Sequence, residues 1–249
     1  MSDKKIISFI LQGKGGCGKS FIATIFTQYV QNSLNKRVSG YDLDQINPTF
    51  SEFKELPVKH YSVIDSVSNK FNSRQFDTVI ESIIIDKSDY IIIDTGSNTF
   101  MQLLEYAAEI NLFQTLEEMG FDIYLHLILC GGDLYKTTLI GVESVIEQFK
   151  SPCIIWLNEH FGPLTNIKDE KIFQSNYTHI NKFKGTVRLV QRDEKTFGED
   201  IRNINEDRII LNSALKKYGL MTQIRLKKIF GDCFSQLDMI YKKDSAINE

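Results

Sequence analysis

The sequence predicts an α/β fold built on a mostly parallel, doubly wound sheet in three layers. Four short apolar runs, at 6–11, 90–94, 124–130 and 153–158, are rich in β-branched and aromatic residues. Unbroken runs of this length are typical of strands that are buried on both faces of a parallel sheet. The stretches between them show helical spacing. This alternation favours βαβ units, in which helices cover the sheet on both sides.

Weaker patterns predict the remaining elements. Residues 37–44 and 186–191 are two further strand candidates. Apolar residues at helical spacing mark four stretches, at 20–34, 73–85, 135–149 and about 221–242. The last stretch carries an apolar stripe made of Met221, Ile224, Ile229, Cys233, Leu237 and Ile240. Because there are only four prolines and no break in composition, we expect one domain over residues 1–249, with this C-terminal helix packed on it.

Composition narrows the class of protein. The 249 residues are 42% hydrophobic, which suffices for one well-buried domain, and the formal net charge of -3 excludes a chain that is basic overall. No uninterrupted apolar run reaches the roughly 20 residues of a membrane span. The four cysteines are scattered without a CxxC pair, which argues against zinc, iron–sulfur and disulfide frameworks. We therefore expect a cytoplasmic protein with no membrane span.

A glycine-rich segment gives the strongest functional signal. Residues 13–20 read G-K-G-G-C-G-K-S and satisfy the pattern G-x-x-x-x-G-K-[ST], between a predicted strand and a predicted helix. In such a loop, backbone N–H groups and the helix N-terminus hold phosphates, a lysine reaches the β- and γ-phosphates, and a hydroxyl ligates Mg²⁺. Lys19 and Ser20 are the residues expected in these two roles. The expected nucleotide contacts are Gly13, Gly15, Gly16, Cys17, Gly18, Lys19, Ser20 and Phe21. The alternative is a tight strand-to-helix turn that happens to be rich in glycine.

Carboxylates follow two of the predicted strands. Asp42 and Asp44 alternate near the end of 37–44, so both can face the loop only if the strand ends between them. Asp94 ends the apolar run at 90–94 and is followed by Gly96, as in a Walker B motif. We expect Asp94 to bind Mg²⁺ through a water and the Gly96 backbone to sense the γ-phosphate. Ligands of doubly wound sheets lie at the carboxyl ends of the strands, where all three motifs would meet.

These motifs resemble the ParA/MinD family of P-loop ATPases. Residues 14–20, KGGCGKS, match the deviant Walker A motif of that family, K-G-G-x-G-K-[ST], at every position. The resemblance implies ATP and Mg²⁺ as cofactors, and it implies that Lys14 contacts the nucleotide of the partner subunit in a face-to-face homodimer. It also implies that Asp44 positions the attacking water and that Asp42 supports Mg²⁺. Residues 45–48, Gln-Ile-Asn-Pro, depart from the usual Pro-Gln-Gly-Asn run, so the switch geometry is expected to differ.

The same resemblance suggests how the base is held. An asparagine that follows the strand at 153–158 reads the adenine edge in many relatives, and Asn158 stands at that place. A planar amide offers both a donor and an acceptor for this purpose. The later stretch 191–200 is expected to close the base pocket.

Further stretches resemble TraL-type proteins of conjugative transfer systems, a branch of that family. They are spread from residue 11 to residue 229 and include LQGKGGCGKSFIAT, EEMGFDIYLHLILCGGD and IWLNEHFGP. The resemblance implies a slow ATP hydrolase, a dimer switched by nucleotide, that acts in plasmid or conjugative DNA transfer or partition. Its partners would be a second copy of itself and conjugation or partition proteins. The alternative is an ATP-binding adaptor that hydrolyses little and docks transfer proteins.

The basic stretch at 208–231 has three possible interpretations. It contains six Lys or Arg residues and no Asp or Glu. It is either the solvated face of a packed C-terminal helix, a non-specific DNA contact or an amphipathic membrane contact.

A third class of function, a metabolic relative of the same fold or a tyrosine autokinase, also remains. The autokinase is weakened because Tyr241 is the one tyrosine near the C-terminus.

Overall fold

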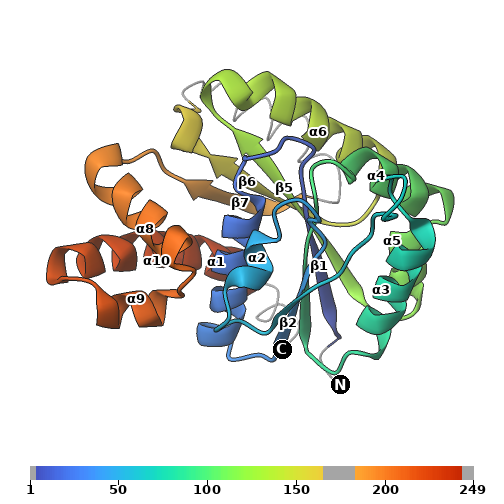
Figure 1. The fold of residues 1–249 in the computed structure, drawn as a ribbon, viewed down its shortest axis with the longest axis horizontal. Helices are drawn as coiled ribbons and strands as arrows, with labels where there is room; N and C mark the ends of the chain where they lie inside the picture. Colours follow the sequence, from blue (N-terminus) through green and yellow to red (C-terminus); the bar gives the residue numbers. More distant parts are fainter. Residues whose placement is uncertain (1–3, 165–182, 243–249) are drawn as a thin grey trace.

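A seven-stranded parallel sheet forms the centre of the molecule (Figure 1). The computed structural model describes residues 4–164 and 183–242. Within these ranges the strand order is β3-β2-β4-β1-β5-β6-β7, and every pairing between strands is parallel. The strands are β1 (Ile6–Leu11), β2 (Val38–Asp42), β3 (Val58–His60), β4 (Tyr90–Asp94), β5 (Asp122–Cys130), β6 (Cys153–Asn158) and β7 (Phe183–Leu189). The predicted strands are all present, and the short edge strand β3 was not predicted.

Helices lie between the strands and after the last of them. They are α1 (Lys19–Asn32), α2 (Thr49–Glu52), α3 (Ser73–Ile85), α4 (Phe100–Glu109), α5 (Leu112–Glu118), α6 (Tyr135–Gln148), α8 (Glu199–Asp207), α9 (Leu211–Lys217) and α10 (Leu220–Tyr241). The four predicted helices correspond to α1, α3, α6 and α10. Three single turns, at Gly132–Leu134, Glu159–Phe161 and Glu194–Gly198, lie in the loops near the carboxyl ends of the strands. Among the helices of the described ranges, none combines the length and apolar character that a bilayer-spanning segment requires.

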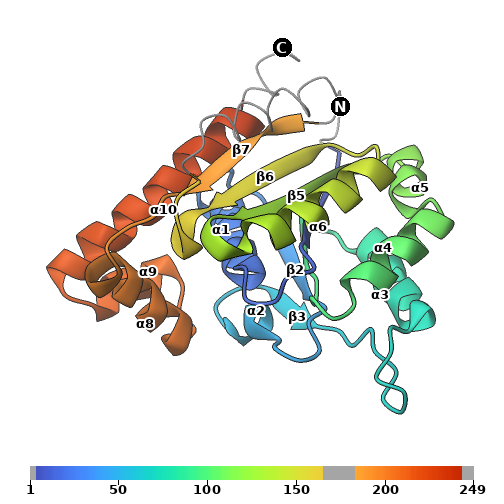
Figure 2. The same cartoon turned by 90° about the horizontal axis from the view of Figure 1, so that it is seen from above.

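Two hydrophobic cores make the fold a three-layer structure. Successive residues of a strand point to opposite faces, so Phe9 belongs to one core and Ile10 to the other. Helices α3, α4, α5 and α6 pack on the Phe9 face, whereas α1, α2 and α10 pack on the Ile10 face (Figures 1 and 2). This arrangement confirms the predicted doubly wound α/β fold.

The strand order places the glycine-rich loop near the middle of the sheet, at the carboxyl ends of the strands. The chain winds from β1 to β2 and β3 on one side, and then crosses from β4 over β1 to β5, β6 and β7 on the other. The loop that leaves β1 therefore lies where the direction of winding reverses, which is where open α/β sheets bind ligands.

The predicted apolar stripe of the C-terminal helix is only partly correct. Ile229, Cys233, Leu237 and Ile240 are buried, but Met221 and Ile224 are 62% and 50% exposed. The first turns of α10 extend beyond the edge strand β7 to lie beside α8 and α9, so they have no sheet to pack against (Figure 2). Leu226 and Phe230 supply the buried contacts that the stripe did not include.

Tyr241 lies in the Ile10-side core rather than on an accessible tail. Its ring packs at a tilt against those of Phe26, Tyr29 and Tyr124, and its hydroxyl lies 3.1 Å from Nε2 of His126. A hydroxyl held in the core is a poor substrate for autophosphorylation, so the structure offers no support for the tyrosine autokinase alternative.

Candidate functional site

The P-loop, defined here as residues 13–20, joins the end of β1 to the start of α1. Gly16 (φ 71°) and Gly18 (φ 96°) have left-handed backbone conformations, which residues with a Cβ rarely adopt. Gly18 is the residue before the first turn of α1, so the N-terminus of this helix opens directly onto the loop. A loop of this shape can present backbone N–H groups to an anion.

The two lysines of the P-loop lie in different environments. Lys19 is only 6% exposed, and its Nζ donates to the backbone oxygen of Lys14 at 3.4 Å. Lys14 is partly exposed at the start of the loop, and its side chain forms no ion pair with any described residue. The buried lysine is therefore held against the loop, whereas the first lysine is available to a group outside the chain.

Two buried aspartates lie side by side next to the P-loop. Asp42 ends β2 and Asp94 ends β4, and they are direct neighbours in the register of these strands. Asp42 accepts hydrogen bonds from the backbone N–H groups of Asp44 and Ser51, at 3.0 and 2.8 Å. Neither carboxylate oxygen of Asp94 accepts a hydrogen bond from any described residue, although the side chain is fully buried.

Asp94 has an unusually high pKa for an aspartate. Burial raises its pKa to about 7, and the neighbouring Asp42 carboxylate adds to that shift, whereas the Ser20 hydroxyl and the Lys19 ammonium oppose it. A buried carboxylate without a partner costs free energy that a cation or a donor would offset. The residues present therefore fit Mg²⁺ and a polyphosphate, because an uncompensated carboxylate stands beside a hydroxyl, a lysine and a glycine-rich loop.

Asp44 lies beyond the end of β2, as its alternation with Asp42 required. Its Oδ1 accepts from the backbone N–H groups of Ile46 and Asn47, both at 3.0 Å, which closes a local turn. An ideal Cβ on Gly96 would lie 3.4 Å from the Cα of Asp44, so these two segments are in contact. One oxygen of Asp44 is thus already used inside the turn.

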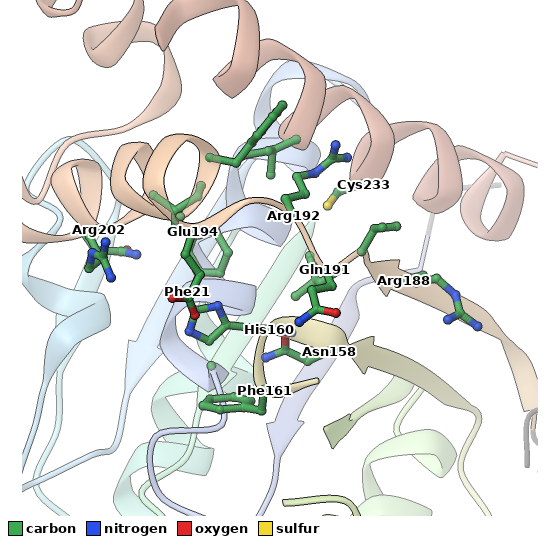
Figure 3. Close-up of a pocket in the computed structure, with 18 of the residues that line it drawn as sticks. Phe21, Asn158, His160, Phe161, Arg188, Gln191, Arg192, Glu194, Arg202 and Cys233 are labelled. Carbon is green, nitrogen blue, oxygen red and sulfur yellow. The ribbon is translucent and has the colours of Figure 1, made fainter. Parts of the chain in front are cut away.

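A cavity of about 360 Å³ adjoins the P-loop (Figure 3). Gly16, Gly18 and Phe21 line it from one side, and residues after β6 and β7 line it from another. The floor is formed by α10 through Ile229, Asp232 and Cys233. Part of the predicted closing stretch also lies along it, namely Gln191, Arg192, Glu194, Phe197 and Gly198. Its size and mixed lining are typical of small-molecule sites.

Asn158 lies between this cavity and the P-loop. Its Nδ2 donates to the backbone oxygen of Cys17 at 3.0 Å, and its Oδ1 accepts from the backbone N–H of His160 at 3.1 Å. One N–H and one lone pair of the amide remain for a ligand. Its predicted contact with adenine stays a prediction, and the structure adds a second role, which is to hold the P-loop. The Cys17 side chain is fully buried, so only its backbone faces the loop.

Sequence patterns missed several residues that build the site. Gln12, one position before the P-loop, is buried and bonds to three separate segments. Arg192 donates to Asp232 at 2.6 Å and lies over the ring of Phe197, which ties the loop after β7 to α10. These contacts join positions far apart in the chain. The only available signal was the polar character of Gln12 directly after a buried strand.

The basic stretch at 208–231 is largely neutralised in the folded protein. Four of its six cations form ion pairs, with partners that lie outside the stretch in every case: Arg208 with Glu52, Lys217 with Asp207, Arg225 with Asp200 and Lys228 with Asp232. Among the described residues, only Lys216 and Lys227 of this stretch lack such a partner. The sequence therefore overstated the positive charge available to a nucleic acid.

Fold and site together define a P-loop protein with the nucleotide-binding α/β fold of the ParA/MinD type. The septum site-determining protein MinD from Pyrococcus horikoshii, solved as a complex with Mg-ADP, has a TM-score of 0.54 at 14% identity, over 94% of this chain and 96% of that one. A structure described as a plasmid partition protein from Borrelia burgdorferi B31, bound to AMPPNP, has a TM-score of 0.50 at 18% identity, over 96% and 99%. At these identities the likeness shows the fold.

Sequence comparison gives the family. No protein-family model matches the chain. Two proteins from Escherichia coli named Protein TraL are 31% and 30% identical to it over 240 residues, which is 93% of this chain and 97% of each relative. The chain belongs to the TraL family.

Proposed function

We propose that this chain is a Mg²⁺-dependent ATPase that closes into a face-to-face homodimer around ATP and reopens after hydrolysis. The observation that carries the proposal is the position of Asp94. Its unpartnered, buried carboxylate lies at the same edge of the sheet as Lys19, Ser20 and the P-loop. An apo protein keeps such a carboxylate at a cost in stability, and a metal-bound triphosphate would remove that cost.

In this proposal, the polar residues at the carboxyl ends of β1, β2 and β4 each have a role. Bound Mg²⁺ would neutralise charge on the phosphate oxygens. Ser20 and Asp94 would hold it, and Asp42, fixed by two backbone donors, would support Asp94 from the side. Lys19 would exchange its long bond to the Lys14 carbonyl for the β- and γ-phosphates. Catalysis would rest on positioning and electrostatic stabilisation, without a covalent intermediate.

Exposed apolar side chains around the P-loop edge support self-association. Ile46 follows β2, Met101 lies in the first turn of α4, and Phe161 follows β6; they are 65%, 48% and 37% exposed. A second copy placed face to face would cover these side chains and bring Lys14 to the nucleotide of its partner. There Lys14 would act like an arginine finger, a kind of contact that is worth about 10³ to 10⁵ in rate where it has been measured.

The nucleoside would occupy the cavity beside the P-loop. The aromatic and aliphatic side chains of Phe21, Phe197 and Ile201 offer apolar surface to a base, and Asn158 offers its remaining donor and acceptor.

The TraL relatives, together with the ParA/MinD fold, support a task in plasmid or conjugative DNA transfer or partition. We propose that the protein performs it in the cytoplasm, with partition or conjugation proteins as partners.

A second candidate is an ATP-binding adaptor that hydrolyses little. The conformation of Asp44 favours it, because one oxygen of the carboxylate that should orient water is held by two backbone N–H groups of its own turn. In this case the nucleotide would order the segment 45–48 for a partner, and turnover would be slow or absent.

The experiment that separates these functions measures molecular mass in solution with ADP and then with a non-hydrolysable ATP analogue, followed by single-turnover hydrolysis with and without DNA. The expected result is a dimer with the analogue, a monomer with ADP, and measurable turnover of ATP in the hydrolysis assay. A nucleotide-dependent dimer without measurable turnover would instead identify the adaptor. A monomer under both conditions would contradict the proposed switch.

A further inference from the structure

Gln12 joins three segments at the back of the P-loop. It follows β1 directly, and its side chain is buried. Its Nε2 donates to the backbone oxygen of Ile128 in β5 at 2.6 Å and to that of Thr138 in α6 at 3.0 Å. Its Oε1 accepts from the backbone N–H of Lys14 at 3.3 Å. The side chain thus links the first lysine of the P-loop to the sheet and to α6.

These three bonds require a neutral carboxamide. Two carbonyl oxygens need a group with two N–H donors, and the Lys14 N–H needs an acceptor on the same side chain. Glutamate would direct oxygen toward two carbonyls, and an aliphatic residue would remove all three bonds and leave the Lys14 N–H without this acceptor. Glutamine therefore fits this position for a chemical reason, although the P-loop pattern begins one residue later.

A glycine in α6 makes room for the carboxamide. An ideal Cβ on Gly141 would lie 2.3 Å from Oε1 of Gln12 and 3.1 Å from its Cδ. Glycine inside a helix is less favourable than alanine, so its presence here needs a reason. The space that the missing methyl group leaves is filled by the Gln12 amide.

The backbone of Lys14 is held at both ends by these contacts. Gln12 accepts from its N–H, and Lys19 donates to its oxygen at 3.4 Å. The second contact is long, and in the proposed function Lys19 gives it up to a phosphate. The other bonds of Gln12 are to β5 and α6, so its contact with Lys14 is expected to persist when nucleotide is bound.

We propose that Gln12, seated against Gly141, is a positioning residue that fixes the backbone of Lys14 and so directs this lysine toward the partner subunit. The inference rests on the proposed function, in which Lys14 acts on the nucleotide of a second copy. Gln12 contacts no phosphate itself. It is expected to affect turnover and dimer formation through Lys14, and to leave nucleotide binding through Lys19 nearly unchanged.

The test is a double-mutant cycle on kcat, ATP affinity and analogue-dependent dimerisation, with wild type, Gln12→Ala, Lys14→Ala and the double variant. We expect Gln12→Ala to lower kcat between about tenfold and a hundredfold, as for a catalytic group displaced by about 1 Å, while ATP affinity stays within about threefold. Combined with Lys14→Ala, it is expected to lower kcat no further, because the same interaction has already been lost. General destabilisation would instead make the two losses multiply.

A second cycle keeps the proposal testable if Gln12→Ala weakens folding. Gly141→Ala in wild type is expected to displace the amide, lowering both the melting temperature and kcat. In the Gln12→Ala background the same methyl group fills the vacated space, so stability is expected to recover while kcat stays low. Ser144→Ala, on the exposed side of α6 where its hydroxyl bonds to Ile140, is the matched control and should change neither value.

Each outcome has a distinct meaning. Losses in kcat that multiply in the first cycle, or equal effects of Gly141→Ala in both backgrounds, would overturn the positioning role while leaving the ATPase proposal intact. If the wild type itself neither hydrolyses ATP nor dimerises with the analogue, the proposed function fails and the positioning role fails with it. In that case the second cycle would still show the packing of Gln12 against Gly141 in the melting temperatures.

Discussion

Asp94 and Asp42 are register neighbours at the ends of β4 and β2, yet only Asp42 accepts hydrogen bonds from backbone N–H groups. Two buried carboxylates in adjacent strands repel each other, and the backbone donors of Asp44 and Ser51 compensate for one of them alone. The two carboxylates therefore differ in their hydrogen bonding even without a bound ligand. One carboxylate is fixed by the protein, and the other is left for a partner from outside the chain.

This asymmetry predicts opposite effects of two matched substitutions in the nucleotide-free protein. Asp94→Asn removes an uncompensated buried charge and is expected to stabilise the fold at pH 8 by about 1–3 kcal/mol. Asp42→Asn replaces an acceptor by an N–H group that faces backbone donors, so it should destabilise by a similar amount. Thermal unfolding of the two variants checks this. If Asp94→Asn lowered the melting temperature, the Ser20 hydroxyl and the Lys19 ammonium would already compensate this carboxylate in the absence of nucleotide.

The two lysines of the P-loop should separate binding from turnover. Lys19→Ala removes the buried ammonium beside the Lys14 carbonyl and is expected to abolish nucleotide binding in a fluorescence titration. Lys14→Ala should leave that binding in place and lower kcat by about 10³ or more, with loss of the analogue-dependent dimer. Normal turnover by a monomeric Lys14→Ala protein would disprove a role across the dimer interface.

His126 should make the fold sensitive to acid. Trp156 donates to its Nδ1 at 3.0 Å, so the proton of the neutral ring sits on Nε2, next to the Tyr241 hydroxyl. Burial lowers the pKa of His126 to about 3, from 6.5. Because the folded state binds a proton less readily than the unfolded state, this contribution to stability is present above about pH 6.5 and is lost as the pH falls toward 3.

The difference in unfolding free energy between wild type and His126→Gln checks this dependence. It should change by up to roughly 1.4 kcal/mol per pH unit between pH 6.5 and 4.5, with wild type losing more. The glutamine can still accept from Trp156, so the variant is expected to fold. Trp156 is the only tryptophan in the chain, and its emission reports unfolding directly. If the unfolding free energies of the two proteins fell equally with pH, the imidazole would be protonated in the folded state, which would contradict the prediction.

The loops after β5 and β6 touch through their backbones and should tolerate no side chain there. An ideal Cβ on Gly131 would lie 1.9 Å from the backbone oxygen of Gly162. Gly131→Ala is therefore expected to destabilise the fold by more than about 2 kcal/mol and to displace the loop that carries His160 and Phe161. Gly231→Ala, at an open position of α10, is the control and should stabilise by about 0.5–1 kcal/mol. Equal effects of both substitutions would contradict the described crossing.

Ion pairing in the 208–231 stretch predicts weak binding to DNA through that stretch. With Lys216 and Lys227 as its unpaired cations, the slope of log K against log salt should be about -2, compared with about -5 if all six cations met phosphates. The double variant Lys216→Ala/Lys227→Ala is expected to remove most of this salt dependence in a fluorescence anisotropy titration. A slope near -5 would require the pairs with Glu52, Asp207, Asp200 and Asp232 to open on DNA.

The strands and the P-loop were predictable because their signals are local. A buried parallel strand needs a short apolar run, and the runs at 6–11, 90–94 and 153–158 have the bounds of β1, β4 and β6. The P-loop pattern places glycines where the backbone turns left-handed, at Gly16 and Gly18. The short strand β3 and the helices α2, α4, α5, α8 and α9 were not predicted, because such short segments hold too few repeats of an apolar pattern.

The sequence by itself determined the fold class, the P-loop and the strand-end carboxylates, since unbroken apolar runs and glycine-rich turns are patterns of near neighbours in the chain. Only the tertiary structure decided which of those carboxylates lacks a partner, how the basic stretch is neutralised and what holds the first lysine. The unpaired Asp94, the bond from Asn158 to Cys17 and the packing of Gln12 against Gly141 all depend on residues brought together across the sheet. Such contacts depend on strand order and register, and local patterns in the chain do not encode these.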